Sequence, residues 1–184
     1  MDDLKYLVPV ATFALGVFAT PYLENLKLRF KVNQLKRDVS TELNEEFVAL
    51  QKAIRTVDKN IKTRENSHPK FIHISQSAPN DFIILEKHFI DIYGHLTPPQ
   101  RLAYKRIMVL NKRINDKRDL VLEKFKEDNW ECLALERTML YEMLSMYYIM
   151  SNLLQSKEHF SFPTKGNDDV VRDAATALNV NFPL

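Results

Sequence analysis

The stretch LRFKVNQLKRDVSTELNEEFVALQKAIRTVDKNI, residues 28–61, decides the fold of this 184-residue chain. Apolar side chains recur along it at steps of three or four residues, which is the spacing of one face of an α-helix. The repeat averages about 3.67 residues per turn, longer than the 3.5 of a strict heptad coiled coil. We therefore predict one amphipathic helix, about 51 Å long over this stretch. Its apolar stripe consists of Leu28, Val32, Leu35, Val39, Leu43, Phe47, Leu50, Ile54, Val57 and Ile61.

Two interpretations of this narrow stripe remain open. It packs either on later helices of the same chain or on the stripes of further copies in a parallel bundle, because its width suits a partner helix better than a whole core. We assign residues 24–65 to this helix and call it a stalk, because it follows a stretch that is apolar and carries no charged side chain.

That preceding stretch, residues 6–23 (YLVPVATFALGVFATPYL), carries no charged side chain. Eighteen residues of helix extend roughly 27 Å, close to the thickness of a hydrocarbon core. A tyrosine stands at each end, as is typical of membrane interfaces. A buried soluble helix and a cleaved signal peptide are the alternatives. Two prolines argue against the first, and the acidic start Met1-Asp2-Asp3 argues against the second. We predict a transmembrane anchor in residues 1–23.

The basic side chains around this stretch predict its orientation. Only Lys5 precedes it, whereas five basic residues follow it closely. Because positive flanks stay in the cytoplasm, we expect a single-pass protein of a bacterial inner membrane, with its N-terminus outside and its C-terminal domain cytoplasmic. The five residues are expected at the membrane interface, in contact with anionic lipid headgroups. They are Lys27, Arg29, Lys31, Lys36 and Arg37.

The remainder of the chain predicts an all-α domain. The whole sequence has only three glycines and eight prolines, too few turn residues for an all-β fold. One cysteine excludes an intramolecular disulfide and agrees with a reducing compartment. We expect a loop over residues 66–80 and a cytosolic bundle of about four helices over residues 81–184. The expected helices run from Asn80 or Asp81 to Gly94, from Pro98 (capped by Thr97) to about Lys126, from about Asn129 to Ser156, and from Asp168 to Leu178.

The sequence contains no recognisable catalytic motif, so we expect no enzyme activity, cofactor or metal site. The lone Cys132 is interpreted as a small buried side chain. The methionine- and tyrosine-rich run over residues 139–150 has two interpretations: it fills the core, or its surplus apolar faces form a subunit interface.

The charge distribution supplies the candidate binding residues. Residues 98–126 carry nine basic and three acidic side chains, whereas residues 127–184 carry four basic and nine acidic ones. Such a helix is either a solvated face paired with the acidic C-terminal part or a site for an anion. The candidate anion-binding residues are Arg101, Lys105, Arg106, Lys112, Arg113, Lys117 and Arg118.

In its layout of membrane helix, stalk and cytosolic helical domain, the chain resembles membrane effectors of bacterial antiphage systems. These include effectors gated by cyclic oligoadenylates that type III CRISPR complexes make. The resemblance implies a homo-oligomer in the lipid bilayer that binds an anionic nucleotide second messenger or nucleic acid and couples it to the membrane helices. The alternative is a constitutive scaffold that tethers a cytosolic protein complex to the membrane. A sensor should bind phosphate-rich ligands in a salt-dependent manner, whereas a scaffold should co-purify with a protein partner.

Overall fold

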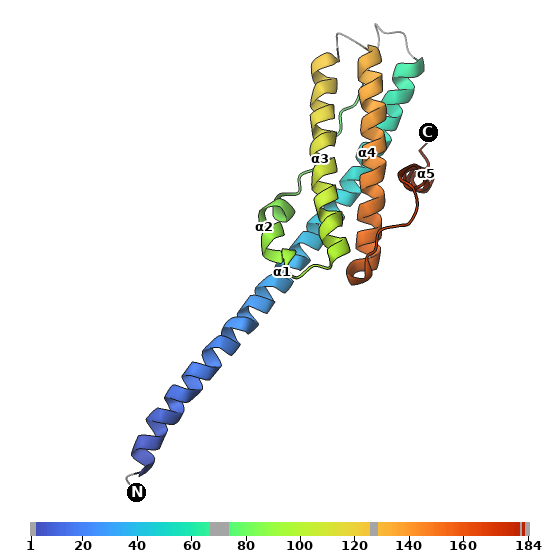
Figure 1. Cartoon of the computed structure of the whole chain (residues 1–184). Helices are drawn as coiled ribbons and strands as arrows, with labels where there is room; N and C mark the ends of the chain where they lie inside the picture. The colour runs from blue at the N-terminus through green and yellow to red at the C-terminus, as the bar shows by residue number, and fades with distance from the viewer. Residues whose placement is uncertain (1–2, 67–73, 126–128, 181, 183–184) are drawn as a thin grey trace. The chain divides into compact units, whose positions relative to one another are not determined.

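The computed structural model describes residues 3–66, 74–125, 129–180 and 182, with side chains from Gly16 onward except Phe18 and Glu158. The described residues form α-helices and a short 3-10 helix and no strand, which confirms the all-α prediction (Figure 1). The helices are α1 (Asp3–Asn66), α2 (Ile83–Tyr93), α3 (Pro98–Lys124), α4 (Asn129–Ser156), the 3-10 helix η2 (Lys157–His159) and α5 (Asn167–Leu178).

The chain divides into two compact units, residues 1–38 and residues 39–184, so the division falls inside α1. In the first unit the Thr20 hydroxyl donates to the Gly16 carbonyl oxygen at 2.7 Å, one turn earlier in the helix. Within the described part of the chain, no helix combines the length and the apolar character that a membrane crossing requires. Residues 1–15, which hold most of the predicted anchor, lie outside the described side chains. The anchor therefore stays a prediction.

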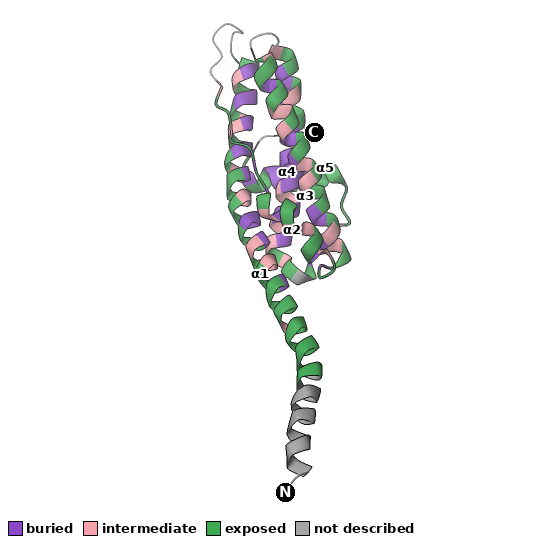
Figure 2. Cartoon of the chain, turned by 90° about the vertical axis from the view of Figure 1, so that its left-hand side faces the viewer, coloured by how far each residue is buried: buried purple, intermediate pink, exposed green. Residues whose placement is uncertain are grey.

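In the second unit, the apolar stripe of α1 packs inside the chain from Val39 onward (Figure 2). Leu50 and Ile54 have no exposed surface, and the ring of Phe47 stacks on Tyr147 of α4 with centroids 5.0 Å apart. Each large apolar side chain that is fully buried contributes about 1.5–3 kcal/mol. Of the two interpretations of the stripe, packing on later helices is therefore correct for residues 39–61.

Helix α2 begins later than predicted because a carboxylate from α1 caps it. Its N-cap residue Phe82 has no capping side chain. Instead the buried Glu42 carboxylate accepts from the backbone N–H of Ile84 (2.6 Å) and of Leu85 (2.8 Å). A carboxylate at a helix N-terminus satisfies free N–H groups and complements the helix dipole.

Asn80, where the sequence predicted a helix start, joins α1 to α3 instead. Its side-chain amide donates to the Glu46 carboxylate at 2.7 Å, and its carbonyl oxygen accepts from the amides of Asn111 (3.0 Å) and Asn115 (3.3 Å). Burial raises the pKa of Glu46, and the Asn80 hydrogen bond opposes that rise. These contacts hold the segment before α2 against both helices.

Helices α3 and α4 pack along each other and form the centre of this unit (Figure 1). Thr97 and Gln100 form a capping box at the start of α3, with proline at the first helical position, as predicted. Helix α4 buries most of residues 139–150, so this run fills the core. Cys132 is also buried, as expected. Helix α5, predicted from Asp168, packs on α4 and begins one residue earlier.

Candidate anion-binding groove

The seven candidate basic residues all lie on α3 but do not form one cluster. Successive helical residues turn by about 100°, so Arg106, Arg113 and Lys117 share a face while Arg118 lies on another. Arg101 packs over the ring of Tyr93, with 4.7 Å between the guanidinium carbon and the ring centroid. Lys105 lies over the same ring at 5.1 Å, and Lys112 is exposed.

The structure places three of the seven in one groove between α3 and α4. This surface, here called the basic groove, encloses about 700 Å³, within the usual range for small-molecule sites. Helix α3 contributes the cationic side chains and apolar positions, and α4 contributes hydroxyl groups and a carboxylate. The lining residues are Lys105, Arg106, Val109, Leu110, Arg113, Thr138, Tyr141, Glu142, Ser145, Ile149 and Asn167.

Glu142 is a buried anion inside the basic groove. Its side chain is only 5% exposed, and it pairs with Arg113 Nη2 at 2.5 Å and with Lys117 Nζ at 2.8 Å. A buried carboxylate needs such partners because its desolvation is costly. Arg113 itself is 58% exposed, so its guanidinium remains accessible to a ligand from the solvent side. The lining contains three cations and one carboxylate, which leaves a net charge of +2.

A small polar cluster lies where the N-terminus of α5 meets the groove. The Tyr141 hydroxyl donates to Asp168 Oδ1 at 2.8 Å, and the Asn167 amide donates to the Tyr141 oxygen at 2.5 Å. Burial and the hydrogen bond to Asp168 raise the pKa of Tyr141. The phenol therefore stays neutral near pH 7 and adds no charge to the groove.

A second hollow of about 360 Å³ continues the basic groove toward the segment before α5. The two share four lining residues, including Arg106 and Asn167. The guanidinium of Arg106 packs over the ring of Phe162, 4.7 Å from its centroid. Lys165 also lines this hollow and pairs with Asp173 at 2.7 Å. The hydrogen bond to Asp173 raises the pKa of Lys165. An elongated ligand could therefore contact cations along both hollows.

The basic residues predicted at the membrane interface lie on α1 in the first unit. Lys27, Arg29, Lys31 and Arg37 are exposed and Lys36 is intermediate. At about 100° per residue they point in several directions around the helix. They therefore surround the helix rather than form one basic face.

Sequence reasoning missed the anionic partner in the groove. Arg113 and Lys117 are spaced by four residues, so they project from one side of α3. Two cations that lie against a neighbouring helix can pair with a carboxylate on it. Glu136 and Glu142 are the only carboxylates between Ala134 and Ser156. Their isolation in an apolar helix was the feature of the sequence from which a pairing with basic residues could have been predicted.

Among the described residues, no group of three or more His, Cys, Asp or Glu side chains could hold a metal ion. The arrangement of the groove is that of a binding surface: fixed cations, hydroxyl and amide groups, and apolar walls. Comparison with protein-family models, with curated proteins and with solved structures finds no match to this chain.

Proposed function

We propose that the helical domain binds an anionic, phosphate-bearing ligand of the nucleotide class in the basic groove, without enzymatic turnover. The observation that carries the proposal is that Lys105, Arg106 and Arg113 all line one groove of about 700 Å³. Guanidinium groups bind phosphate oxygens through charge-assisted, often paired hydrogen bonds. The net positive lining also attracts anions from solution.

The other lining groups suit the remainder of a nucleotide. Val109, Leu110 and Ile149 provide apolar surface for a base, and Ser145 and Tyr141 provide hydroxyl groups that can bond ribose or phosphate. The continuation toward Lys165 leaves room for a second phosphate group or a second nucleotide. An oligonucleotide second messenger therefore fits the groove better than a lone inorganic ion.

We further propose that residues 6–23 anchor the chain in a bacterial inner membrane as a single-pass helix, with the remainder in the cytoplasm. The same helix, α1, contains both this stretch and the apolar side chains that are buried from Val39 onward. A change in the packing of the helical domain would therefore reach the membrane along continuous backbone. Because a lone uncharged span offers no polar path, action on the membrane would require several copies. Such a protein would work as an oligomeric antiphage effector.

The test uses the full chain in detergent or nanodiscs and a fluorescent oligoadenylate, with ATP and a non-adenosine RNA as competitors. We expect binding that weakens steeply with salt, because phosphate contacts release counterions. Arg106→Gln should weaken binding about 10-fold, since a charge-assisted hydrogen bond contributes about 1.5–3 kcal/mol. Lys112→Gln is the matched control, because Lys112 is exposed and does not line the groove. Absence of salt-sensitive binding to every probe would refute the proposal, and equal effects of the two variants would refute the assigned site.

A further inference from the structure

The second hollow beside the basic groove has walls that suit a flat aromatic group. It encloses about 360 Å³ and is here called the Phe162 hollow. Leu102 of α3, Tyr148 of α4, and Phe162 and Pro163 of the segment before α5 line it and do not line the basic groove. Leu102 is 44% exposed, and Tyr148 and Phe162 are half-buried. Nucleic-acid bases stack on aromatic side chains that are accessible in this way.

Arg106 lies at the junction of the two hollows. Among the described residues, four side chains line both hollows, and Arg106 is the charged one of the four. It is exposed, and its guanidinium packs over the ring of Phe162, 4.7 Å from the centroid. That ring packs in turn against the buried Phe160, with centroids 5.1 Å apart. Stacking orients a guanidinium and leaves its N–H groups available to an acceptor.

The charge of Arg106 is not neutralised by a neighbour. Arg113 pairs with Glu142 in the basic groove, and Lys165 pairs with Asp173 beside the Phe162 hollow. Within the described part of the chain, by contrast, no carboxylate pairs with Arg106. A phosphate would give this guanidinium its charged partner. The junction therefore suits one anionic group with an apolar wall on either side of it.

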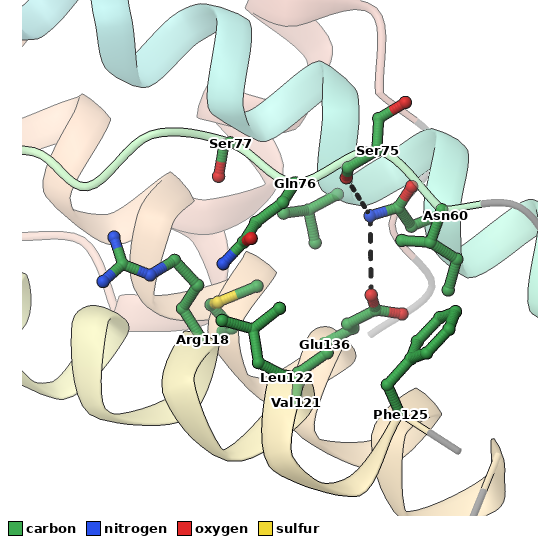
Figure 3. A pocket seen from close by; sticks show the side chains of 12 residues that line it. Asn60, Ser75, Gln76, Ser77, Arg118, Val121, Leu122, Phe125 and Glu136 are labelled. Atoms are coloured by element: carbon green, nitrogen blue, oxygen red, sulfur yellow. Dashed lines mark hydrogen bonds between the residues drawn. The ribbon is translucent and has the colours of Figure 1, made fainter.

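A smaller cavity of about 180 Å³, shown in Figure 3, does not offer a comparable cation. It lies among α1, α3, α4 and the segment over residues 74–77. The two charged side chains that line it among the described residues are both paired, Glu136 with Arg64 at 2.6 Å and Arg118 with Asp119 at 2.9 Å. We therefore place the anion at Arg106 and not in this cavity.

We propose that the two hollows together bind a dinucleotide unit, with its phosphodiester at Arg106 and one base in each hollow. This inference rests on the function proposed above. It narrows the ligand class from nucleotides in general to phosphodiester-linked nucleotides of at least two units. One base lies against Val109 and Leu110 in the basic groove, and the other lies against Leu102 and Phe162. A mononucleotide fills one hollow only, and further phosphate groups do not replace the second base.

The test compares the dinucleoside monophosphate ApA with AMP on the full chain in detergent, by ligand-observed NMR and calorimetry. ApA carries a single negative charge, whereas a phosphomonoester carries about −1.5 to −2 near pH 7, so charge alone would make AMP the tighter ligand. We expect ApA to bind about 10-fold more tightly than AMP, because one more stacked base contributes about that factor.

The fluorescent oligoadenylate, measured in parallel, separates this inference from the proposed function. If the oligoadenylate binds in a salt-sensitive manner but ApA binds no more tightly than AMP, the dinucleotide inference is wrong and the proposed function stands. If neither the oligoadenylate nor either small nucleotide binds, both are wrong.

Two leucines on α3 provide matched variants that locate the second base. Leu102 lines the Phe162 hollow, whereas Leu120, 40% exposed on the same helix, is not among the described residues that line either hollow. Leu102→Gln should weaken ApA binding about fivefold, because apolar contact with the base is lost. It should leave AMP within about twofold, since AMP can place its base in the basic groove. Leu120→Gln should change neither affinity.

Equal effects of the two substitutions on ApA would overturn the placement of the second base. Both leucines are exposed, and circular dichroism confirms that each variant is folded. The comparison of ApA with AMP on the parent chain stands without the variants.

Discussion

Replacing Arg64 by Met should be among the most destabilising single changes in the helical domain. Arg64 and Glu136 form an ion pair at 2.6 Å in which both side chains are only 1% exposed. The guanidinium also donates to Asn129 Oδ1 at 2.8 Å and lies over the ring of Phe125, 5.6 Å from its centroid. Without Arg64, the Glu136 carboxylate would remain buried with only the distant Asn60 amide beside it.

The magnitude follows from this geometry. Removing one partner of a buried ion pair costs about 3–5 kcal/mol, a large part of the total of about 5–15 kcal/mol for a domain. The substitution also removes the buried Nη2 of Arg64, which has no hydrogen-bond partner among the described residues, and this removal stabilises the variant. The expected loss of stability therefore lies near the lower end of that range of about 3–5 kcal/mol. The double variant Arg64→Met/Glu136→Met should recover most of it, because two apolar side chains of similar size leave no buried charge.

The assay is equilibrium urea unfolding of the full chain in detergent, followed by circular dichroism and by fluorescence of Trp130, the single tryptophan. The pH dependence provides a second readout. Burial raises the pKa of Glu136 above its ordinary value of 4.5, while the hydrogen bond and charge of Arg64 oppose the rise. A carboxyl with a raised folded pKa holds more protons when folded, so its contribution to stability falls as pH rises from about 4.5 through the folded pKa.

In Arg64→Met the opposing influence of the guanidinium is gone, so the pKa of Glu136 should rise further. The variant should therefore be less destabilised near pH 5 than near pH 7. At pH 7 the buried Glu136 carboxyl is either ionised without its partner or must take up a proton from neutral solution, and both lower the stability of the folded state. A loss below about 1 kcal/mol at pH 7, or a double variant no more stable than Arg64→Met, would refute the description of this pair as a buried, mutually dependent unit.

Two further predictions concern other carboxylates. Glu42→Ala removes the cap of α2 and should cost about 1–2 kcal/mol, with faster amide hydrogen exchange at Ile84 and Leu85; unchanged exchange there would contradict the capping role. Glu142→Gln removes the internal anion from the basic groove and should tighten oligoadenylate binding about fivefold, because one unit charge on the order of 8 Å away at an intermediate effective dielectric contributes about 1 kcal/mol. Weaker binding by this variant, with its fold intact, would show that Glu142 positions the cations rather than competes with the ligand.

Local features of the fold could be predicted from the sequence, and pairings across the chain could not. The Thr97 cap, the proline that follows it and the apolar period of α1 are properties of neighbouring residues, so they are visible in one sequence. The Glu42 cap of α2 joins residues 42 positions apart, and Asn80 bonds to Asn111 across 31 positions. Such contacts depend on how helices pack and leave no local pattern.

The candidate site was predictable in part. The excess of basic residues predicted a helix that lines the basic groove, but a count of charges does not say in which direction each side chain points. At about 100° per residue, Arg106, Arg113 and Lys117 point to one side and Arg118 to another. That angular calculation shows that the seven basic residues do not all share one face, and it needs no structure. The role of Glu142 and Asn167 in lining the groove required the packing of α4 and α5.

Hydrogen–deuterium exchange on the full chain in nanodiscs, with and without oligoadenylate, tests the central claim most directly. The basic groove predicts protection in α3 around residues 105–113 and in α4 around residues 141–149, and loss of that protection at high salt. Absence of protection in both segments at saturating ligand, or protection confined to other helices, would contradict it.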